Sequence, residues 1–259
     1  MPSEWTKDSL TQKLKEIRDK QWIPSGRSAH SAGAVGNTLE DMLGIRENNV
    51  PLADAGIYEI KTQREQTGSL TTLFHFEPKP RRPGIVADIF LPNYGWAHDS
   101  IPNERSFRVT MSGDRFTDRG FRVIVDRPSK IVNIHFDQAQ VDRKKHSVWL
   151  DDVRKKAGLG EVSPRPYWDF ADLNKKLMTK LRNAIYLRAD SKIVDGKELF
   201  RYSQAELWEN PDFDRFLNAI EKGSILVDFD ARTHHNHGTK YRIRQDRVPE
   251  LYATITRIF

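Results

Sequence analysis

The residues best suited to chemistry lie in one short stretch, Asp54-Ala-Gly-Ile-Tyr-Glu-Ile-Lys-Thr62. Side chains alternate between the two faces of a β-strand, so Glu59 and Lys61 share a face, and Asp54 lies just before them among small residues. Two carboxylates can hold a hard divalent cation, and a nearby amine can stabilise the charge that develops on a phosphate. The stretch therefore suits metal-dependent cleavage of a phosphodiester. The alternative is a solvated strand in which Glu-x-Lys is only a charge pair.

A third carboxylate, Glu40, lies upstream in a segment that reads as the start of a helix, Gly36-Asn-Thr-Leu-Glu-Asp-Met-Leu43. Thr38 is expected to cap this helix, with Asp41 completing a capping box. Glu40 then either complements the positive end of the helix dipole or joins the acidic group. Spacing alone favours the first reading.

The second distinctive segment is His234-His-Asn-His-Gly-Thr-Lys-Tyr-Arg242. On a loop before a strand, His235, His237 and Arg242 can hydrogen-bond base edges in a major groove, where Arg pairs best with guanine. Arg232, just upstream, is a further candidate. Zinc binding would need more ligands than this segment offers. The alternative is that these are ordinary polar residues of the surface.

Two basic loops could lie against a phosphate backbone. The small-residue segment 24–36 contains Arg27, and the Pro-rich segment 77–104 contains Arg81 and Arg82. Small residues let a backbone approach a phosphate closely, and Arg can pair with it. A flexible connector and a solvated surface loop are the corresponding alternatives.

Apolar periodicity and turn residues outline the elements that must position these groups. Helices are expected at 5–20, 36–43, 169–182 and 213–223. Strands are expected at 56–62, 70–76, 121–126, 130–136, 184–190, 197–203, 224–229, 240–244 and 252–258. Helices and strands without regular alternation predict an α+β fold, with a mixed β-sheet flanked by helices.

Three details of this arrangement can be tested against a structure. Strand 70–76 is expected to pair with strand 56–62, and strands 121–126 and 130–136 are expected to form a hairpin. The Pro-rich segment 77–104 is expected to contain neither a helix nor a central strand. The charged segment 142–166 is the best candidate for an insertion.

Composition narrows the class of protein. The chain has 259 residues, of which 37% are apolar and 30% charged, so it can form one large domain or two lobes with a shared core. Its net charge of +6 favours polyanions, without distinguishing nucleic acid from an acidic protein or a membrane surface. The lack of cysteine excludes disulfides and thiolate chemistry. No apolar run resembles a signal peptide or a membrane span, so we expect a soluble intracellular protein.

A helical Glu, then Asp, then Glu-x-Lys in a strand resembles the active site of PD-(D/E)xK nucleases. Within these, the chain resembles the MvaI/BcnI family of type II restriction endonucleases, in the MutH-like branch. The shared segments lie in the same order over residues 30–259. They are Gly-x-Thr-x-Glu-Asp-x-Leu (36–43), Asp-x4-Glu-Ile-Lys-Thr (54–62), Ser-Leu-x-Thr-Leu-Phe (69–74), Thr-x-Ser-Gly (110–113), Ser-Lys-Ile (191–193) and His-x-His-Gly-Thr-x-Tyr-Arg-Ile (235–243).

The resemblance implies a PD-(D/E)xK core with two lobes around a DNA cleft, in a single nuclease domain over residues 1–259. The catalytic lobe would centre on 1–140, and recognition elements would lie mainly in 75–115 and 225–259. The implied catalytic residues are Glu40, Asp54, Glu59 and Lys61, with Mg²⁺ held by Asp54, Glu59 and the carbonyl of Ile60. The implied DNA-binding residues are His75, Arg232, His235, His237 and Arg242, together with Arg27, Arg81 and Arg82. His75 favours BcnI-like over MvaI-like specificity, since a BcnI-like chain reads the central base pair with a histidine near this position.

The implied function is Mg²⁺-dependent hydrolysis of double-stranded DNA at a short, pseudosymmetric CC-N-GG-like site, giving 5′-phosphate ends. A monomer in the cytoplasm of a prokaryotic cell is expected, without membrane contact, beside a cognate DNA methyltransferase that shares the site but need not bind. Two alternatives stay open at this point. One is a MutH-like mismatch-repair nicking endonuclease, and the other is a sequence-specific DNA-binding protein without catalysis.

Overall fold

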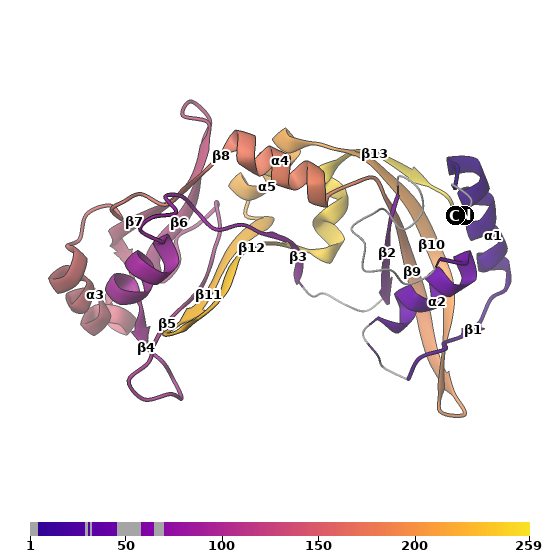
Figure 1. The fold of residues 1–259 in the computed structure, drawn as a ribbon, viewed down its shortest axis with the longest axis horizontal. Coiled ribbons are helices and arrows are strands. Elements are labelled where there is room, and N and C mark those ends of the chain that lie inside the picture. The colour runs from indigo at the N-terminus through magenta and orange to yellow at the C-terminus, as the bar shows by residue number, and fades with distance from the viewer. Residues whose placement is uncertain (1–4, 29–30, 32, 46–57, 65–69) are drawn as a thin grey trace. The chain divides into compact units, whose positions relative to one another are not determined.

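The computed structural model describes residues 5–28, 31, 33–45, 58–64 and 70–259 (Figure 1). The chain forms two compact units. The first takes residues 1–68, 181–212 and 252–259, and the second takes residues 69–180 and 213–251. Residues 69–140, part of the lobe expected to centre on 1–140, fall in the second unit. None of the described helices is long and apolar enough to cross a membrane.

The first unit is built on a five-stranded mixed sheet in the order β1, β10, β9, β2, with β13 also pairing with β10. The strands are β1 (Ile23–Pro24), β2 (Glu59–Arg64), β9 (Ala184–Val194), β10 (Lys197–Pro211) and β13 (Tyr252–Arg257). β2 runs parallel to β9, and the other pairs are antiparallel. The expected pairing of strand 56–62 with strand 70–76 is wrong, since β3 (Leu70–His75) pairs with β12 (His235–Arg244) in the second unit.

Two helices of the first unit, α1 (Lys7–Asp19) and α2 (Ala34–Leu43), pack their apolar faces into the core of this sheet. Tyr58 and Ile60, which flank Glu59, are buried in that core. Because strand side chains alternate, Glu59 and Lys61 point to the opposite face of the sheet. The buried residues of this short strand therefore anchor β2 in the core, and the alternation places its two charged residues on the opposite face.

The expected cap of the second helix is wrong. α2 begins at Ala34, Gly33 is its N-cap, and Thr38 lies inside the helix. The Thr38 hydroxyl donates to the carbonyl of Ala34 at 2.7 Å, which is the bond that a threonine within a helix commonly makes. Glu40 therefore lies in the second turn of α2 and not in the first, so the helix dipole gives a weaker account of this carboxylate.

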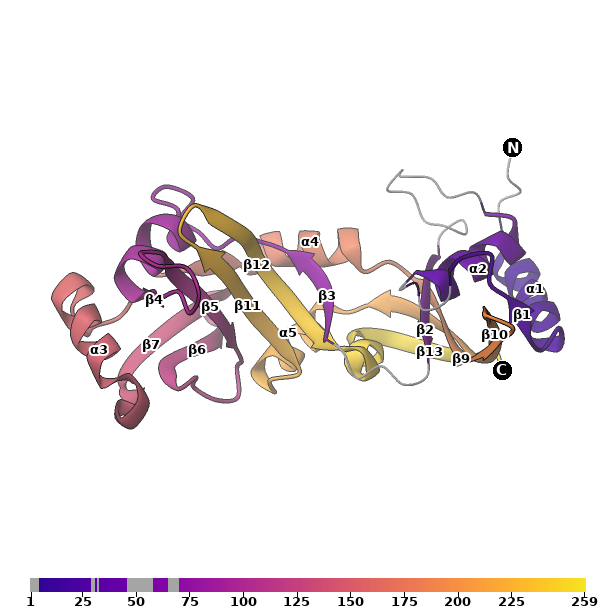
Figure 2. The same cartoon turned by 90° about the horizontal axis from the view of Figure 1, so that it is seen from below.

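The second unit contains an antiparallel five-stranded sheet in the order β3, β12, β11, β5, β4. Its strands are β3 (Leu70–His75), β4 (Trp96–Ala97), β5 (Arg105–Met111), β11 (Ile225–Arg232) and β12 (His235–Arg244). A three-stranded sheet holds β6 (Arg119–Asp126), β7 (Ile131–Val141) and β8 (Tyr167–Asp169). β6 and β7 form the expected hairpin. Figure 2 shows β3, β12, β11 and β5 as neighbouring strands.

Helices of the second unit are α3 (Arg143–Ala157), α4 (Phe170–Lys180), α5 (Phe213–Glu221), a π-helix η1 (Ile85–Tyr94) and a 3₁₀-helix η2 (Gln245–Leu251). The expectation of no helix in 77–104 is wrong. η1 contains Pro92, but its Phe90 is fully buried and stacks on Phe107 at 4.5 Å between ring centroids. The free energy gained by burying such aromatic side chains outweighs the unfavourable helix propensity of one proline.

The charged segment 142–166 also contains a helix that its composition did not indicate. Most of α3 is polar, yet Trp149, Leu150 and Val153 are buried along one side of it. Asp142 caps the helix by accepting a hydrogen bond from the amide of Lys144 at 3.1 Å. Three apolar residues in a basic sequence are thus enough to anchor the helix to the unit.

Candidate functional site

Glu59 and Lys61 lie side by side on β2, at the edge of the sheet that the described strands form. The ammonium group of Lys61 donates to Oε1 of Glu59. Their side chains are 31% and 47% exposed, so both can be reached from solvent. This is the carboxylate–amine pair that the sequence predicts. Asp54, the third member of the predicted group, lies outside the described residues.

The backbone of β2 is fixed to β9 at its first residue. The amide of Glu59 donates to the carbonyl of Asn183 at 2.8 Å, and Glu59 and Lys61 pair in parallel register with Ala184 and Tyr186. In a parallel ladder, alternate residues bond to the same neighbouring strand. The backbone groups of Ile60 therefore point away from β9.

The side chain of Asn183 is held in turn, because its Oδ1 accepts from the amide of Asn210 at 3.0 Å. Asn210 lies near the end of β10 with a φ of 58°. Two asparagines outside the sequence motif thus hold the start of β2.

Glu40 approaches β2 from the face covered by the helices. A Cβ atom placed on Gly36, one helical turn before Glu40, would lie 3.2 Å from Oγ1 of Thr62 and 3.9 Å from Oε1 of Glu40. α2 therefore packs against β2 at a glycine, and the carboxylate of Glu40 lies near Thr62. Glu59 and Lys61 point to the other face. Among the described residues, no three His, Asp or Glu side chains converge as a metal site.

An aromatic cluster lies on the same face of the sheet as Glu59 and Lys61. Tyr186 stacks on Trp208 at 4.3 Å between ring centroids, and Trp208 contacts Tyr252 at 5.6 Å. Burial, reinforced by the negative charge of Glu59, raises the pKa of Tyr252. The cluster provides a rigid apolar floor beside the charged pair. The sequence motif does not indicate these residues. Tyr186 lies in the strand expected at 184–190, and Trp208 follows the strand expected at 197–203.

A buried ion pair fixes the far end of β2. Glu198 is 3% exposed, and Arg64 donates to its two carboxylate oxygens at 2.9 and 3.0 Å. Arg64 also donates to the carbonyl of Ser31 at 2.8 Å. This bond links β2 to the small-residue segment that contains Arg27. The guanidinium of Arg27 lies 3.2–3.3 Å from the side-chain oxygen of Asn37, with the Asn37 amide oriented so that this oxygen accepts.

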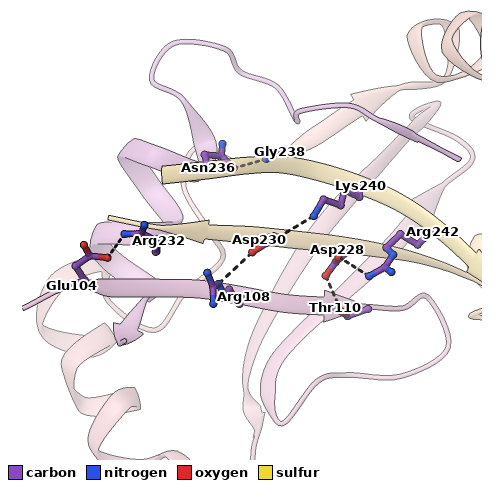
Figure 3. A network of polar contacts seen from close by, with 10 residues as sticks. All are labelled: Glu104, Arg108, Thr110, Asp228, Asp230, Arg232, Asn236, Gly238, Lys240 and Arg242. Carbon is purple, nitrogen blue, oxygen red and sulfur yellow. Dashed lines mark hydrogen bonds and ion pairs between the residues drawn. The ribbon is translucent and has the colours of Figure 1, made fainter. Parts of the chain in front are cut away.

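A band of charged side chains covers one face of the large sheet in the second unit (Figure 3). Asp228, Asp230 and Arg232 alternate with buried residues along β11, so all three share this face. Side chains of β12 and β5, together with Glu104 just before β5, form ion pairs with these three residues. Ion pairs join Arg242 to Asp228 at 3.2 Å, Lys240 to Asp230 at 3.0 Å, Arg108 to Asp230 at 3.2 Å and Arg232 to Glu104 at 2.6 Å.

The predicted histidines belong to this charged face. The rings of His235 and His237 meet edge to face with centroids 4.2 Å apart. Burial alone would raise the pKa of Asp230, but Lys240, His237 and Arg108 together hold this pKa below its ordinary value. His75 of β3 pairs in register with Lys240. The structure therefore gathers His75, Arg232, His235, His237 and Arg242 on one face.

Two details of the prediction change. His235 and His237 lie within β12 and not in a loop before it, because β11 pairs with this polar stretch across a bulge near Gly238, whose φ is 84°. Sequence reasoning also missed Arg108, Asp228, Asp230 and Lys240. The alternation Asp-x-Asp-x-Arg in 228–232 was the available signal for two of these.

The remaining predicted arginines do not join this face. The guanidinium of Arg81 lies over the ring of Phe76 at 5.5 Å, near Lys176 of α4. Phe76 follows His75 directly, so it points to the opposite side of the strand. Arg82 is exposed in the turn before η1. Arg27 belongs to the first unit.

Comparison with known proteins agrees with this geometry. The sequence profile of the MvaI/BcnI restriction endonuclease family matches residues 11–252. Among curated proteins, none matches the chain. A solved structure titled "Restriction endonuclease MvaI-cognate DNA substrate complex" is similar at a TM-score of 0.66 and 24% identity, covering 98% of this chain and 100% of the other. "Restriction endonuclease MvaI in the absence of DNA" is similar at a TM-score of 0.64 and 21% identity, covering 96% of each chain.

These likenesses confirm the predicted mixed α+β fold of PD-(D/E)xK nucleases. The family match extends over both units and over both groups of residues described above. The chain belongs to the MvaI/BcnI restriction endonuclease family and is a type II restriction endonuclease, a site-specific deoxyribonuclease.

Proposed function

We propose that this endonuclease hydrolyses double-stranded DNA in a Mg²⁺-dependent reaction at a short, pseudosymmetric CC-N-GG-like site, and leaves 5′-phosphate ends. The observation that carries the proposal is the solvent-accessible pair of Glu59 and Lys61 on β2, the last strand in the sheet that the described residues form. A related endonuclease has been solved with its cognate DNA substrate, which supports DNA as the ligand.

The residues present suit a hard cation. The carboxylate of Glu59 and the carbonyl of Ile60 are oxygen donors of the kind that Mg²⁺ prefers, and Asp54 would add another carboxylate. When bound, the ion would neutralise phosphate charge and make a water molecule more acidic. Cysteine, the usual ligand of competing soft metals, is missing from the chain.

Lys61 would serve the reaction directly. Its ammonium group already reaches the carboxylate beside it. With the carboxylate of Glu59 serving as a metal ligand, the ammonium group would be able to donate to the attacking water and to the scissile phosphate. Glu40, approaching from the other face, would orient the surroundings of this site or hold a second ion.

The charged face of the second unit would read the bases. Arg232 and Arg242 are the residue type that pairs with O6 and N7 of guanine, as a CC-N-GG-like frame requires. Both are held by carboxylates, so their guanidinium groups are oriented before DNA arrives. His75 would read the central base pair. We further propose that the enzyme acts as a monomer, in the cytoplasm of a prokaryotic cell, beside a methyltransferase that protects the same site.

Digestion of a sequenced phage DNA tests the proposal. Purified protein with Mg²⁺ should give discrete fragments, and sequencing of their ends should reveal one short motif with 5′-phosphates. The same reaction with a chelator in place of Mg²⁺ should give intact DNA. Cutting without a common sequence, or cutting that the chelator leaves unchanged, would contradict it.

A further inference from the structure

A groove of about 700 Å³ lies in the second unit among β4, the start of β6 and α3, and neither group of residues described above lines it. Its walls include the indoles of Trp96 and Trp149 and the basic side chains of Arg119, Lys145 and Lys155. The groove combines aromatic and basic side chains, and Asp151 and Asp152 of α3 also line it.

Arg119 is the unusual member of this group. Its side chain is only 20% exposed, and its guanidinium carbon lies 4.0 Å from the ring centroid of Trp96 and 5.6 Å from that of Trp149. Its Nε is buried without a hydrogen-bond partner in the part of the chain that the structure describes. Its ion pair with Asp118 is long, at 3.8 Å.

The nearby carboxylates have other partners. Asp118 is bonded at 2.8 Å to Nε2 of His146. Asp152 accepts from Arg105 at 3.1 Å and from Lys156 at 2.8 Å. On the same helix, Asp151 is paired with Arg154 at 3.0 Å. The positive charge of Arg119 is therefore poorly compensated inside the unit.

Burying a guanidinium is unfavourable unless its donors are satisfied, and stacking on indole offsets only part of that cost. Burial lowers the pKa of Arg119, against the opposing effect of Asp118 and Asp99, which agrees with incomplete compensation. An oxyanion in the groove would supply the missing acceptors. The planar fork of a guanidinium matches the oxygens of a phosphate group.

We propose that this groove binds a phosphate group, with Arg119 as the buried anchor and Lys145 and Lys155 at the rim. The phosphate could be free in solution or part of a DNA backbone beyond the recognised site. The chemistry of recognition is the same for both sources. The proposal is independent of the catalytic assignment, since none of these residues lies near β2 in the sequence or belongs to its unit.

Titration of inorganic phosphate into the full-length protein at constant ionic strength tests this proposal, with calorimetry and tryptophan fluorescence as readouts. Saturable binding is expected, because Trp96 and Trp149 flank the site. Arg119→Gln should weaken it at least tenfold, and Lys155→Gln severalfold. Lys144→Gln, on the same helix but outside the groove, should leave it unchanged.

The proposal is overturned if wild-type protein shows no saturable binding, or if both Arg119→Gln and Lys155→Gln bind phosphate as wild type does. Should Arg119→Gln not fold by circular dichroism, the exposed Lys155 decides alone. A second comparison identifies the source of the phosphate, using one duplex that covers only the recognition site and one extended by a helical turn at each end. If the source is DNA, Lys155→Gln weakens binding of the longer duplex alone. If it is free phosphate, both duplexes bind as before while phosphate binding is still reduced.

Discussion

The backbone amide of Glu59 donates to the carbonyl of Asn183, and the side chain of Asn183 is in turn held by the amide of Asn210. The backbone that carries the Glu59 carboxylate is therefore positioned by residues more than a hundred positions later in the chain. This relationship explains why the two charged residues of β2 depend on the hairpin of β9 and β10, and it can be tested by substitution.

Asn183→Ala removes the side-chain acceptor while keeping the backbone carbonyl. The loss of one hydrogen bond, about 1 kcal/mol, should lower the single-turnover rate of cleavage about fivefold. Affinity for DNA in Ca²⁺ should not change, because Asn183 is not among the base-reading residues. Asn183→Asp keeps an acceptor oxygen and should recover most of the rate. Wild-type cleavage by Asn183→Ala would show that this contact does not position Glu59.

Arg242→Ala should remove discrimination at one base pair. The cost for a guanine contact is about 1–3 kcal/mol, so affinity for the cognate duplex should fall about five- to 150-fold, while affinity for unrelated DNA falls much less. Competition binding in Ca²⁺ measures both. Arg143→Ala, which changes an exposed arginine of α3 outside the charged face, serves as the control. Equal losses on cognate and unrelated DNA would mean that Arg242 contacts only phosphate.

Tyr241→Phe should stabilise the protein. Tyr241 is fully buried against Phe74, Phe216 and Trp168, and its hydroxyl has no hydrogen-bond partner among the described residues. Removing this uncompensated polar group should raise the free energy of unfolding by about 1 kcal/mol. Chemical denaturation measures the change.

Tyr202→Phe is the matched control for that substitution. Tyr202 is equally buried, but its hydroxyl donates to the carbonyl of Val35 at 2.8 Å. The same change of atoms should therefore lower stability by about 1 kcal/mol. Equal effects of the two substitutions would contradict the different roles assigned to the two hydroxyls.

Glu209 should make a pH-dependent contribution to stability. The hydrogen bond from Lys7 at 2.7 Å, with another from Tyr58 at 3.0 Å, holds the pKa of Glu209 below its ordinary value of 4.5. A carboxyl with a lowered folded-state pKa stabilises the protein above its unfolded-state pKa and loses that contribution as pH falls through the folded-state pKa. The difference in unfolding free energy between wild type and Glu209→Gln, about 1 kcal/mol or less, should thus be present at neutral pH and vanish well below pH 4.5. A difference that grew on acidification would contradict this account.

Local pattern was sufficient for some elements of this protein. Alternation in Tyr58-Glu-Ile-Lys-Thr62 predicts that Glu59 and Lys61 share a face, and the structure places them so. The helices near 169–182 and 213–223 have clear apolar periodicity, and they appear as α4 and α5. In each case the decisive interactions lie within a few residues of one another.

Other features depend on distant partners. The pairing of β2 with β9 joins residues about 125 positions apart, and no local pattern encodes it. His235 and His237 extend a strand only because β11 supplies the hydrogen bonds. η1 forms around Pro92 because Phe90 is buried by residues of three other elements. Tertiary contacts determine all three features, so local sequence patterns predicted a different structure in each case.

The most direct test of catalysis by Glu59 and Lys61 compares cleavage with binding. Single-turnover cleavage of a cognate duplex in Mg²⁺ and affinity for the same duplex in Ca²⁺ should be measured for wild type, Glu59→Ala and Lys61→Ala, with Lys144→Ala as an exposed control. Because both residues act on the reacting phosphate, each substitution should slow cleavage about a thousandfold or more while cognate affinity changes only slightly. Cleavage at the wild-type rate by either variant would contradict the assignment of the active site.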